Sequence, residues 1–261
     1  PSNVAVGWRG CIEERQTYDI QDYNNVDLSK ALDLDIDLVP DSSKPETQWK
    51  PMLHELSFER QMGAGANRFD PAPIQTGYNY MNAAWWGHSG CPAAARKLAP
   101  ITSTQLDAYL ATLTPYGNTY HDIGMIWGGR LLSPTGIFAA DNADVNGQTT
   151  SRNLIMLTDG QTEPLDVVYG AYGIEPLDKR RWKPGDSYTL TQTVEKRFSF
   201  ACNEVKKRNI TVWFISFGTA LNPIFTQCAG PGHYFKADNA SELEAAFSDI
   251  AKHMGDLRIS Q

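Results

Sequence analysis

This sequence has neither long apolar runs nor extended clusters of basic residues. No stretch reaches about 18 consecutive apolar residues, the length that a membrane-spanning helix needs. Lys and Arg gather only in short groups such as Lys179-Arg180-Arg181, and the formal net charge is −7. Nucleic-acid phosphates are bound by clustered basic side chains. We therefore expect no membrane span in this chain and no nucleic-acid partner.

Cysteine spacing typical of metal or redox sites is absent too. The four cysteines, Cys11, Cys91, Cys202 and Cys228, include no Cys-x-x-Cys pair, which argues against a zinc ribbon or a thioredoxin-type site. An even number of cysteines suits two disulfides, which can be paired in three ways. We predict pairing within each part of the chain, Cys11 with Cys91 and Cys202 with Cys228. The alternative is a set of buried free thiols.

The common catalytic motifs are also lacking. His88-Ser89-Gly90 is not a Gly-x-Ser-x-Gly nucleophile turn, and no His-Glu-x-x-His occurs. We expect that the chain is not an enzyme. The competing hypothesis is a metal-dependent hydrolase that uses Asp159, His121 and Asp122, since the last two lie in the first turns of a predicted helix close to Thr119.

Among the features that are present, residues 153–160 give the clearest signal. A short apolar run ends at Thr158-Asp159-Gly160. This pattern predicts a strand buried on both faces of a parallel sheet. In such sheets ligands collect at the carboxyl ends of the strands, where Asp159 would lie. The alternative is a plain sheet strand with an Asx turn at its end.

A second signal lies upstream. Gly117-Asn118-Thr119 opens a predicted helix whose apolar residues Tyr120, Ile123, Trp127 and Leu131 are three and four positions apart. Thr119 by itself is equally typical of a helix N-cap. In this order, however, the Gly-x-Thr helix start and the Thr-Asp-Gly strand end resemble the von Willebrand factor A domain. That resemblance implies that Thr119 and Asp159 are two of the polar groups around a divalent cation.

Residues 101–261 alternate between helix and strand patterns, and we predict that they form the C-terminal part of this domain. Helix and strand in alternation predict a doubly wound, mostly parallel α/β sheet. The supporting elements are a capping box at Thr102 and Gln105, a helix over 190–205, a buried strand over 210–218, an edge strand over 233–237, and a last helix capped by Ser241 and Glu244.

Residues 1–100 are poorly periodic, and we predict that they form an irregular, disulfide-linked insertion. Within them, residues 32–38 alternate strictly between apolar residues and aspartates. This alternation predicts a strand with one apolar and one carboxylate face. A solvated face is the interpretation we favour over a calcium site, because strand geometry holds the carboxylates about 7 Å apart.

The order of motifs along the whole chain resembles the TadG-type proteins of Tad/Flp pilus assembly. That resemblance implies a non-enzymatic, periplasmic or cell-surface protein that acts by adhesion or protein contact with a pilus or secretion assembly, in a parent anchored in the inner membrane. The alternative is a cytosolic von Willebrand A subunit that partners a metal-inserting ATPase. The matching motifs are Trp8-x-Gly10-Cys11-Ile12-Glu13-x-Arg15, Cys91-Pro92, Trp127-Gly128-x-Arg130, Cys202-x-x-x-Lys206 and Gln227-Cys228-Ala229.

One part of the family pattern is missing. The Asp-x-Ser-x-Ser motif that supplies the principal cation ligands in von Willebrand A domains does not occur in this sequence. We expect the strand that carries it to precede Pro1. Thr119 and Asp159 are then a partial site, so we predict no cofactor in this fragment and Mg²⁺ or Ca²⁺ in the full-length parent.

Residues 161–187 read as a long polar loop above the carboxyl edge of the sheet. Tyr172 and Trp182 lie on this loop. Aromatic side chains on a polar loop are typical anchors of protein interfaces. We therefore predict that both rings bind the partner. The alternative is that they fold back and cover the first part of the chain.

Overall fold

A three-stranded parallel sheet forms the centre of the fold. The computed structural model describes residues 10–52, 56–58, 74–76, 92–96, 99–114, 118–166 and 169–256. The strands are β5 (Arg152–Thr158), β8 (Ile210–Phe217) and β9 (Tyr234–Ala237), in the order β5-β8-β9. Arg152 pairs with Ile210, and the parallel register continues to Thr158 and Ser216. The mixed α/β class and the parallel sheet are thereby confirmed.

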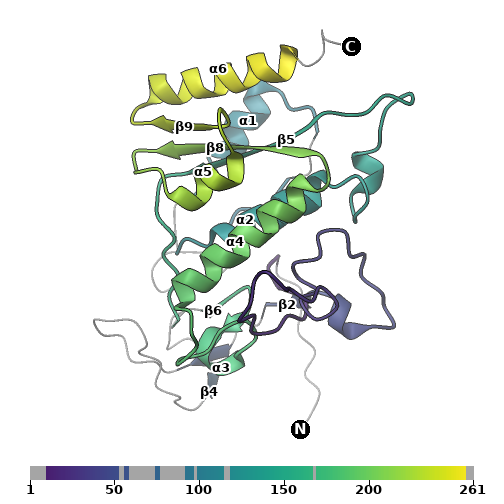
Figure 1. Ribbon diagram of the computed structural model, residues 1–261, viewed down its shortest axis with the longest axis vertical. Coiled ribbons are helices and arrows are strands. Elements are labelled where there is room, and N and C mark those ends of the chain that lie inside the picture. The colour runs from purple at the N-terminus through teal and green to yellow at the C-terminus, as the bar shows by residue number, and fades with distance from the viewer. Residues whose placement is uncertain are drawn as a thin grey trace.

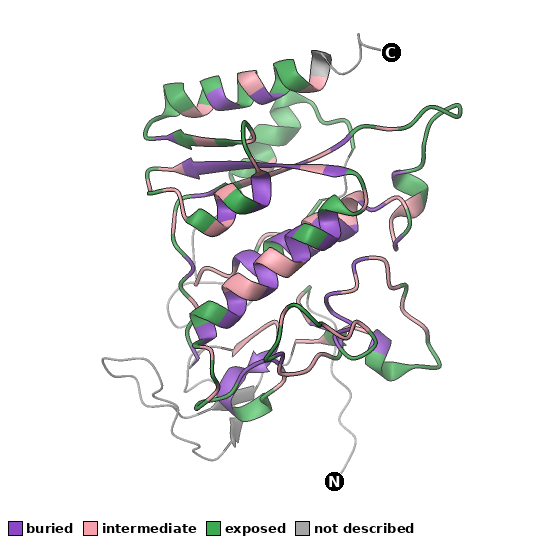
Figure 2. Cartoon of the chain, viewed as in Figure 1, coloured by how far each residue is buried: buried purple, intermediate pink, exposed green. Residues whose placement is uncertain are grey.

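Helices cover both faces of this sheet (Figure 1). On one face α6 (Ala240–Asp256) packs against Trp213 and Ile215. The other face carries α2 (His121–Leu132), α4 (Leu190–Lys206) and α5 (Pro223–Ala229). Figure 2 shows β8 and the inner side of α4 as buried, while the outer side of α6 is exposed.

The prediction that residues 153–158 are buried on both faces is wrong. Leu157 is 49% exposed, and Ile155 and Met156 are only partly buried. The reason is that β5 is an outer strand of the described sheet. The most buried strand is β8, which lies between β5 and β9, and its residues 212–216 are all buried.

The longer helices follow their sequence signals, with two differences. The predicted helix over 190–205 is confirmed as α4. Its apolar stripe is buried throughout and consists of Leu190, Val194, Phe198, Ala201 and Val205; Thr189 and Gln192 add a capping box. In α2, by contrast, the most buried face includes Met125, Ile126 and Gly129, because the helix contacts α4, β5 and the first part of the chain. The last helix is capped by Asn239, whose Oδ1 accepts from Glu242 N at 3.1 Å, and not by Ser241.

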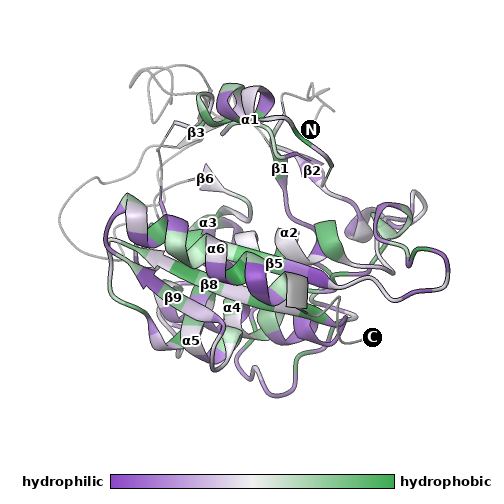
Figure 3. Cartoon of the chain, turned by 90° about the horizontal axis from the view of Figure 1, so that it is seen from above, coloured by the Kyte–Doolittle hydropathy of each residue, from purple (hydrophilic) through white to green (hydrophobic). Residues whose placement is uncertain are grey.

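Helix α1 (Ser103–Leu110) has the predicted capping box between Thr102 and Gln105. It lies apart from the sheet (Figure 3), and its residues Leu106 and Leu110 are 41% and 50% exposed. The other short elements are β1 (Ile12–Glu13), η1 (Pro45–Thr47), β2 (Lys50–Pro51), β3 (Leu56–Phe58), β4 (Ile74–Thr76), η3 (Ala139–Asp141), β6 (Tyr169–Gly170), β7 (Gly173–Ile174) and α3 (Glu175–Asp178). No helix of the described residues is both long enough and apolar enough to cross a bilayer.

Residues 32–38 form a succession of turns, so the strand predicted there is wrong. Leu34 and Ile36 enter the main core, but Asp33 is buried as well. The aspartates bind local backbone or arginines: Asp35 Oδ1 accepts from Asp37 N at 3.1 Å, and Asp37 Oδ2 accepts from Arg208 at 2.8 Å. The alternation of apolar residues and aspartates over 32–38 therefore arises because the apolar side chains enter the core while the aspartates bind backbone groups or arginines. It does not indicate an extended backbone.

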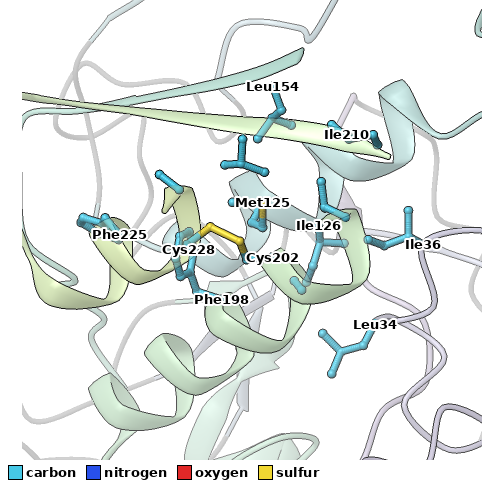
Figure 4. Packing of buried hydrophobic residues seen from close by; sticks show 14 of the residues in the cluster. Leu34, Ile36, Met125, Ile126, Leu154, Phe198, Cys202, Ile210, Phe225 and Cys228 are labelled. Carbon is cyan, nitrogen blue, oxygen red and sulfur yellow. A yellow bond between two sulfur atoms is a disulfide. The ribbon is translucent and has the colours of Figure 1, made fainter. Parts of the chain in front are cut away.

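The core joins the early residues to the sheet and its helices (Figure 4). Leu34 and Ile36 lie in one cluster with Phe198 of α4 and Phe225 of α5. The predicted Cys202–Cys228 disulfide is confirmed and lies within this cluster. Cys11 is disulfide-bonded, but Cys91, its predicted partner, lies outside the described residues.

The approach of α2 to α4 depends on Gly129. A Cβ atom at this position would lie 2.7 Å from Val205 Cγ2 and 2.8 Å from Ile36 Cδ1. We predict that Gly129→Ala lowers the free energy of unfolding by about 1–3 kcal/mol, the usual cost of overpacking a core. Urea denaturation measures this loss. The control is Gly124→Ala on the same helix, where the new Cβ would meet only Met156 Cε at 3.4 Å; a similar loss in both variants would contradict the packing argument.

Candidate functional site

Thr119 lies at the carboxyl edge of the sheet, next to the turn that follows β5. A Cβ atom at Gly160 would lie 3.9 Å from Thr119 Oγ1. Thr119 is held there by a backbone bridge to Glu163, with N-to-O distances of 3.3 and 3.2 Å. Asp159 is exposed in the same turn. The two residues predicted for the cation site therefore belong to one edge of the fold.

His121, at the start of α2, holds this edge through side-chain contacts with two threonines. Its ring nitrogens lie 3.0 Å from Thr162 Oγ1 and 2.9 Å from Thr158 Oγ1, so one imidazole joins α2 to β5 and to the following loop. The ring also packs edge-on against Phe225 and Phe198. Burial lowers the pKa of His121 to about 4. The residue is consequently a neutral structural link, and its nitrogens are engaged by threonines.

The pH dependence of stability should report this link. The unfolded chain takes up a proton at His121 near pH 6.5, whereas the folded chain does so only near pH 4. Stability is therefore expected to fall as the pH falls through this window, by about 2 kcal/mol between pH 7 and pH 5. Urea denaturation at several pH values measures the loss.

His121→Gln should remove that part of the pH dependence, because glutamine does not titrate. Equal slopes in the unmodified chain and in His121→Gln would show that another group carries the effect.

The described residues do not supply a complete cation site. Thr119 and Asp159 offer two side-chain positions, while Mg²⁺ prefers six oxygen ligands. Within the described ranges no group of three or more His, Cys, Asp or Glu residues is placed to hold a metal ion. Residues beyond these two would have to complete any such site.

Exposed side chains nevertheless gather at this edge. We call Asp159, Gln161, Glu163 and Leu165 the edge surface; all four are exposed, and Leu165 is 46% exposed. Gln161 Nε2 donates to Thr219 Oγ1 at 3.2 Å and to Ala220 O at 3.1 Å, which ties the loop after β5 to the loop after β8. The edge surface thus presents two carboxylates and one apolar side chain on an anchored loop.

The prediction that Tyr172 and Trp182 contact a partner does not fit the structure. Their side chains are 1% and 3% exposed. Tyr172 Oη donates to Asp33 Oδ2 at 2.6 Å, and this burial raises the pKa of Tyr172 well above its usual value. Trp182 packs with Leu190 and Val194. Tyr172 follows the alternative and covers the first part of the chain, whereas Trp182 packs against α4.

A buried charge network holds the early residues to the helices. Both oxygens of Glu14 accept from Arg130, at 2.8 and 3.0 Å, and from the indole nitrogens of Trp127 and Trp49, at 2.9 and 3.2 Å. Two further pairs, Arg197 with Asp33 and Arg181 with Asp122, lie in the same region. Asp122 is buried, and its Oδ2 accepts from Arg181. The sequence gives no signal for this network, because its partners are far apart along the chain.

Comparison with known proteins leaves the family open. No protein-family model matches the sequence, and no curated protein matches it either. A comparison with solved structures aligns 58% of this chain with the open conformation of the pilus adhesin SpaC from Lactobacillus rhamnosus GG, at 20% identity and a TM-score of 0.37. A second form of the same adhesin matches at 21% identity and the same TM-score of 0.37. This chain spans 21% of the length of those structures, and these values assign it to no family.

Proposed function

We propose that this chain is a non-enzymatic, extracytoplasmic component of Tad/Flp pilus assembly that acts by protein–protein contact or adhesion. The observation that carries the proposal is the Cys202–Cys228 disulfide, which lies inside the main core. Structural disulfides persist in oxidising compartments such as the periplasm and the cell surface, and are rare in the cytosol. The order of the sequence motifs supports the pilus assignment.

The partner contacts the edge surface in this proposal. Loops at the carboxyl edge of a parallel sheet are the usual position of binding residues in open α/β folds. Leu165 offers an exposed apolar side chain, and Asp159 and Glu163 add negative charge around it. This arrangement suits a partner with a small apolar depression and basic residues at its rim.

We further propose that Thr119 and Asp159 contribute to a Mg²⁺ or Ca²⁺ site in the full-length parent. Their common position at one edge supports this role. A segment with an Asp-x-Ser-x-Ser motif would have to supply the remaining oxygens. In this chain alone, Asp159→Ala should leave the melting temperature unchanged because Asp159 is exposed.

Two alternative functions make different predictions. A cytosolic subunit of a metal-inserting ATPase would keep Cys202 and Cys228 as thiols in the cell. Alkylation of the denatured protein directly after cell lysis distinguishes the two locations: oxidised cysteines support our proposal, and free thiols support the cytosolic subunit. A hydrolase built on Asp159, His121 and Asp122 is not supported by the geometry, because the last two are buried and engaged.

Deletion of the encoding gene in the source organism tests the function directly. We expect loss of surface pili or of adhesion, counted by electron microscopy and by cell attachment. Complementation with the unmodified gene should restore both, and complementation with Leu165→Asp should restore less at an equal protein level. Normal pili and normal adhesion in the deletion strain would refute the proposal.

A further inference from the structure

Arg15 is a buried cation without a hydrogen-bond acceptor in the described part of the chain. Its side chain is 1% exposed, and Nε, Nη1 and Nη2 all lack a partner. A guanidinium has five N–H donors in one plane and is always charged in proteins. The indole of Trp49 covers one face of it, with 3.9 Å between Arg15 Cζ and the ring centroid. Its N–H donors lie in the plane of the guanidinium, parallel to the stacked face, and so remain accessible to an acceptor in that plane.

The carboxylates Glu14, Asp35 and Asp33 attract Arg15 electrostatically but accept no hydrogen bond from it. Glu14 accepts four hydrogen bonds from Arg130, Trp49 and Trp127. Asp33 Oδ2 accepts from Tyr172 and Arg197, while its Oδ1 makes no hydrogen bond to Arg15 or to any other residue. None of these oxygens accepts a hydrogen bond from the guanidinium. Because a buried N–H donor without an acceptor is costly, Arg15 needs a hydrogen-bond acceptor that the described residues do not provide.

Two guanidinium groups lie beside Trp49. Arg15 and Arg130 lie over the same indole, with Cζ atoms 3.9 and 5.2 Å from its centroid, and Glu14 is the carboxylate that contacts Arg130. Burial and the charge of Arg130 lower the pKa of Arg15 to about 10. The nearby carboxylates Glu14, Asp35 and Asp33 act in the opposite direction and raise it. Arg15 therefore remains protonated near neutral pH, so its guanidinium keeps its positive charge and all its donors.

We propose that Arg15, stacked on Trp49, binds a small anion of the carboxylate or halide class. A carboxylate matches the planar fork of a guanidinium and can accept two parallel hydrogen bonds. The ligand must be small, because the side chain of Arg15 is 1% exposed. This site lies in the early part of the chain and is independent of the edge surface, so its failure would leave the proposed function untouched.

Thermal unfolding of the whole chain tests the site, with acetate replacing a bulky sulfonate at constant ionic strength. The melting temperature should rise along a saturable curve, by about 3–5 °C when acetate exceeds its dissociation constant roughly tenfold. Arg15→Gln should lose this rise. The matched control is Arg96→Gln, since Arg96 is exposed and stacks on Tyr109 at 5.5 Å; it should retain the rise.

Chlorine-35 NMR of the unmodified chain gives a second readout that does not depend on the folding of a variant. Chloride exchange at Arg15 should broaden the line, and added acetate should narrow it by competition. A linear, unsaturable response to acetate, or an equal response in Arg15→Gln, would overturn the proposal. So would an effect of an acidic peptide without any effect of acetate and chloride, because the ligand would then be a protein carboxylate.

Discussion

Replacing Glu14 by alanine should lower the free energy of unfolding by about 3–5 kcal/mol, the range expected when one partner of a buried ion pair is removed. Arg130 is 0% exposed, so it would remain buried without its counter-ion. The indole N–H groups of Trp49 and Trp127 would lose their acceptor as well. Because these contacts join the early residues to α2, we expect unfolding at a lower urea concentration and faster proteolysis in residues 10–52.

Two further variants separate the charge from the packing. The double variant Glu14→Met, Arg130→Met removes both charges, and it should recover part of the stability because a buried pair replaced by apolar side chains of similar size is often tolerated. Lys252→Met breaks an exposed pair with Asp249 and should change little. An effect of Glu14→Ala no larger than that of Lys252→Met would contradict the role of the network.

Replacing Trp182 by alanine should also cost about 3–5 kcal/mol, the typical loss for a large aromatic side chain removed from a core. The ring is 3% exposed and packs with Leu190 and Val194 at the start of α4. Its Nε1 also donates to Tyr188 O at 2.9 Å, which closes the preceding loop. Calorimetry should show a clear fall in melting temperature.

Leu165→Ala is the matched control for Trp182→Ala. Leu165 also lies between β5 and α4, but it is 46% exposed, so its truncation should leave the melting temperature nearly unchanged. Partner capture should weaken in Leu165→Ala. If Trp182→Ala instead kept its melting temperature and lost partner capture, the ring would be an interface anchor after all.

Local sequence signals located those elements whose stabilising contacts are close in the chain. The α4 stripe, the capping box at Thr102 and the Cys202–Cys228 bridge all depend on residues within about 30 positions of one another. The turns over 32–38 were not predictable in this way. Asp33 and Asp37 are fixed by arginines more than 160 positions away, so the alternation was interpreted as a strand.

The candidate site was predictable only in outline. The apolar run that ends at Thr158-Asp159-Gly160 correctly predicted that Asp159 follows a strand at the carboxyl edge of the sheet. Thr119 lies beside the turn that contains Asp159. Periodicity could not show that His121 would lie between two threonines, since that contact depends on how α2 meets β5. Composition likewise suggested that Tyr172 was an interface residue, whereas the buried Asp33 and Arg197 hold its hydroxyl.

Site-specific photo-crosslinking in the source organism tests the central claim most directly, namely that the edge surface binds a protein partner. A photoreactive amino acid is placed at Leu165 or Glu163, and for control at Ser248, an exposed residue of α6. We predict one discrete, heavier adduct from each edge position, with a pilus-assembly protein identified in it by mass spectrometry, and no adduct from Ser248. Adducts from Ser248 alone, or none from the edge positions, would contradict the account.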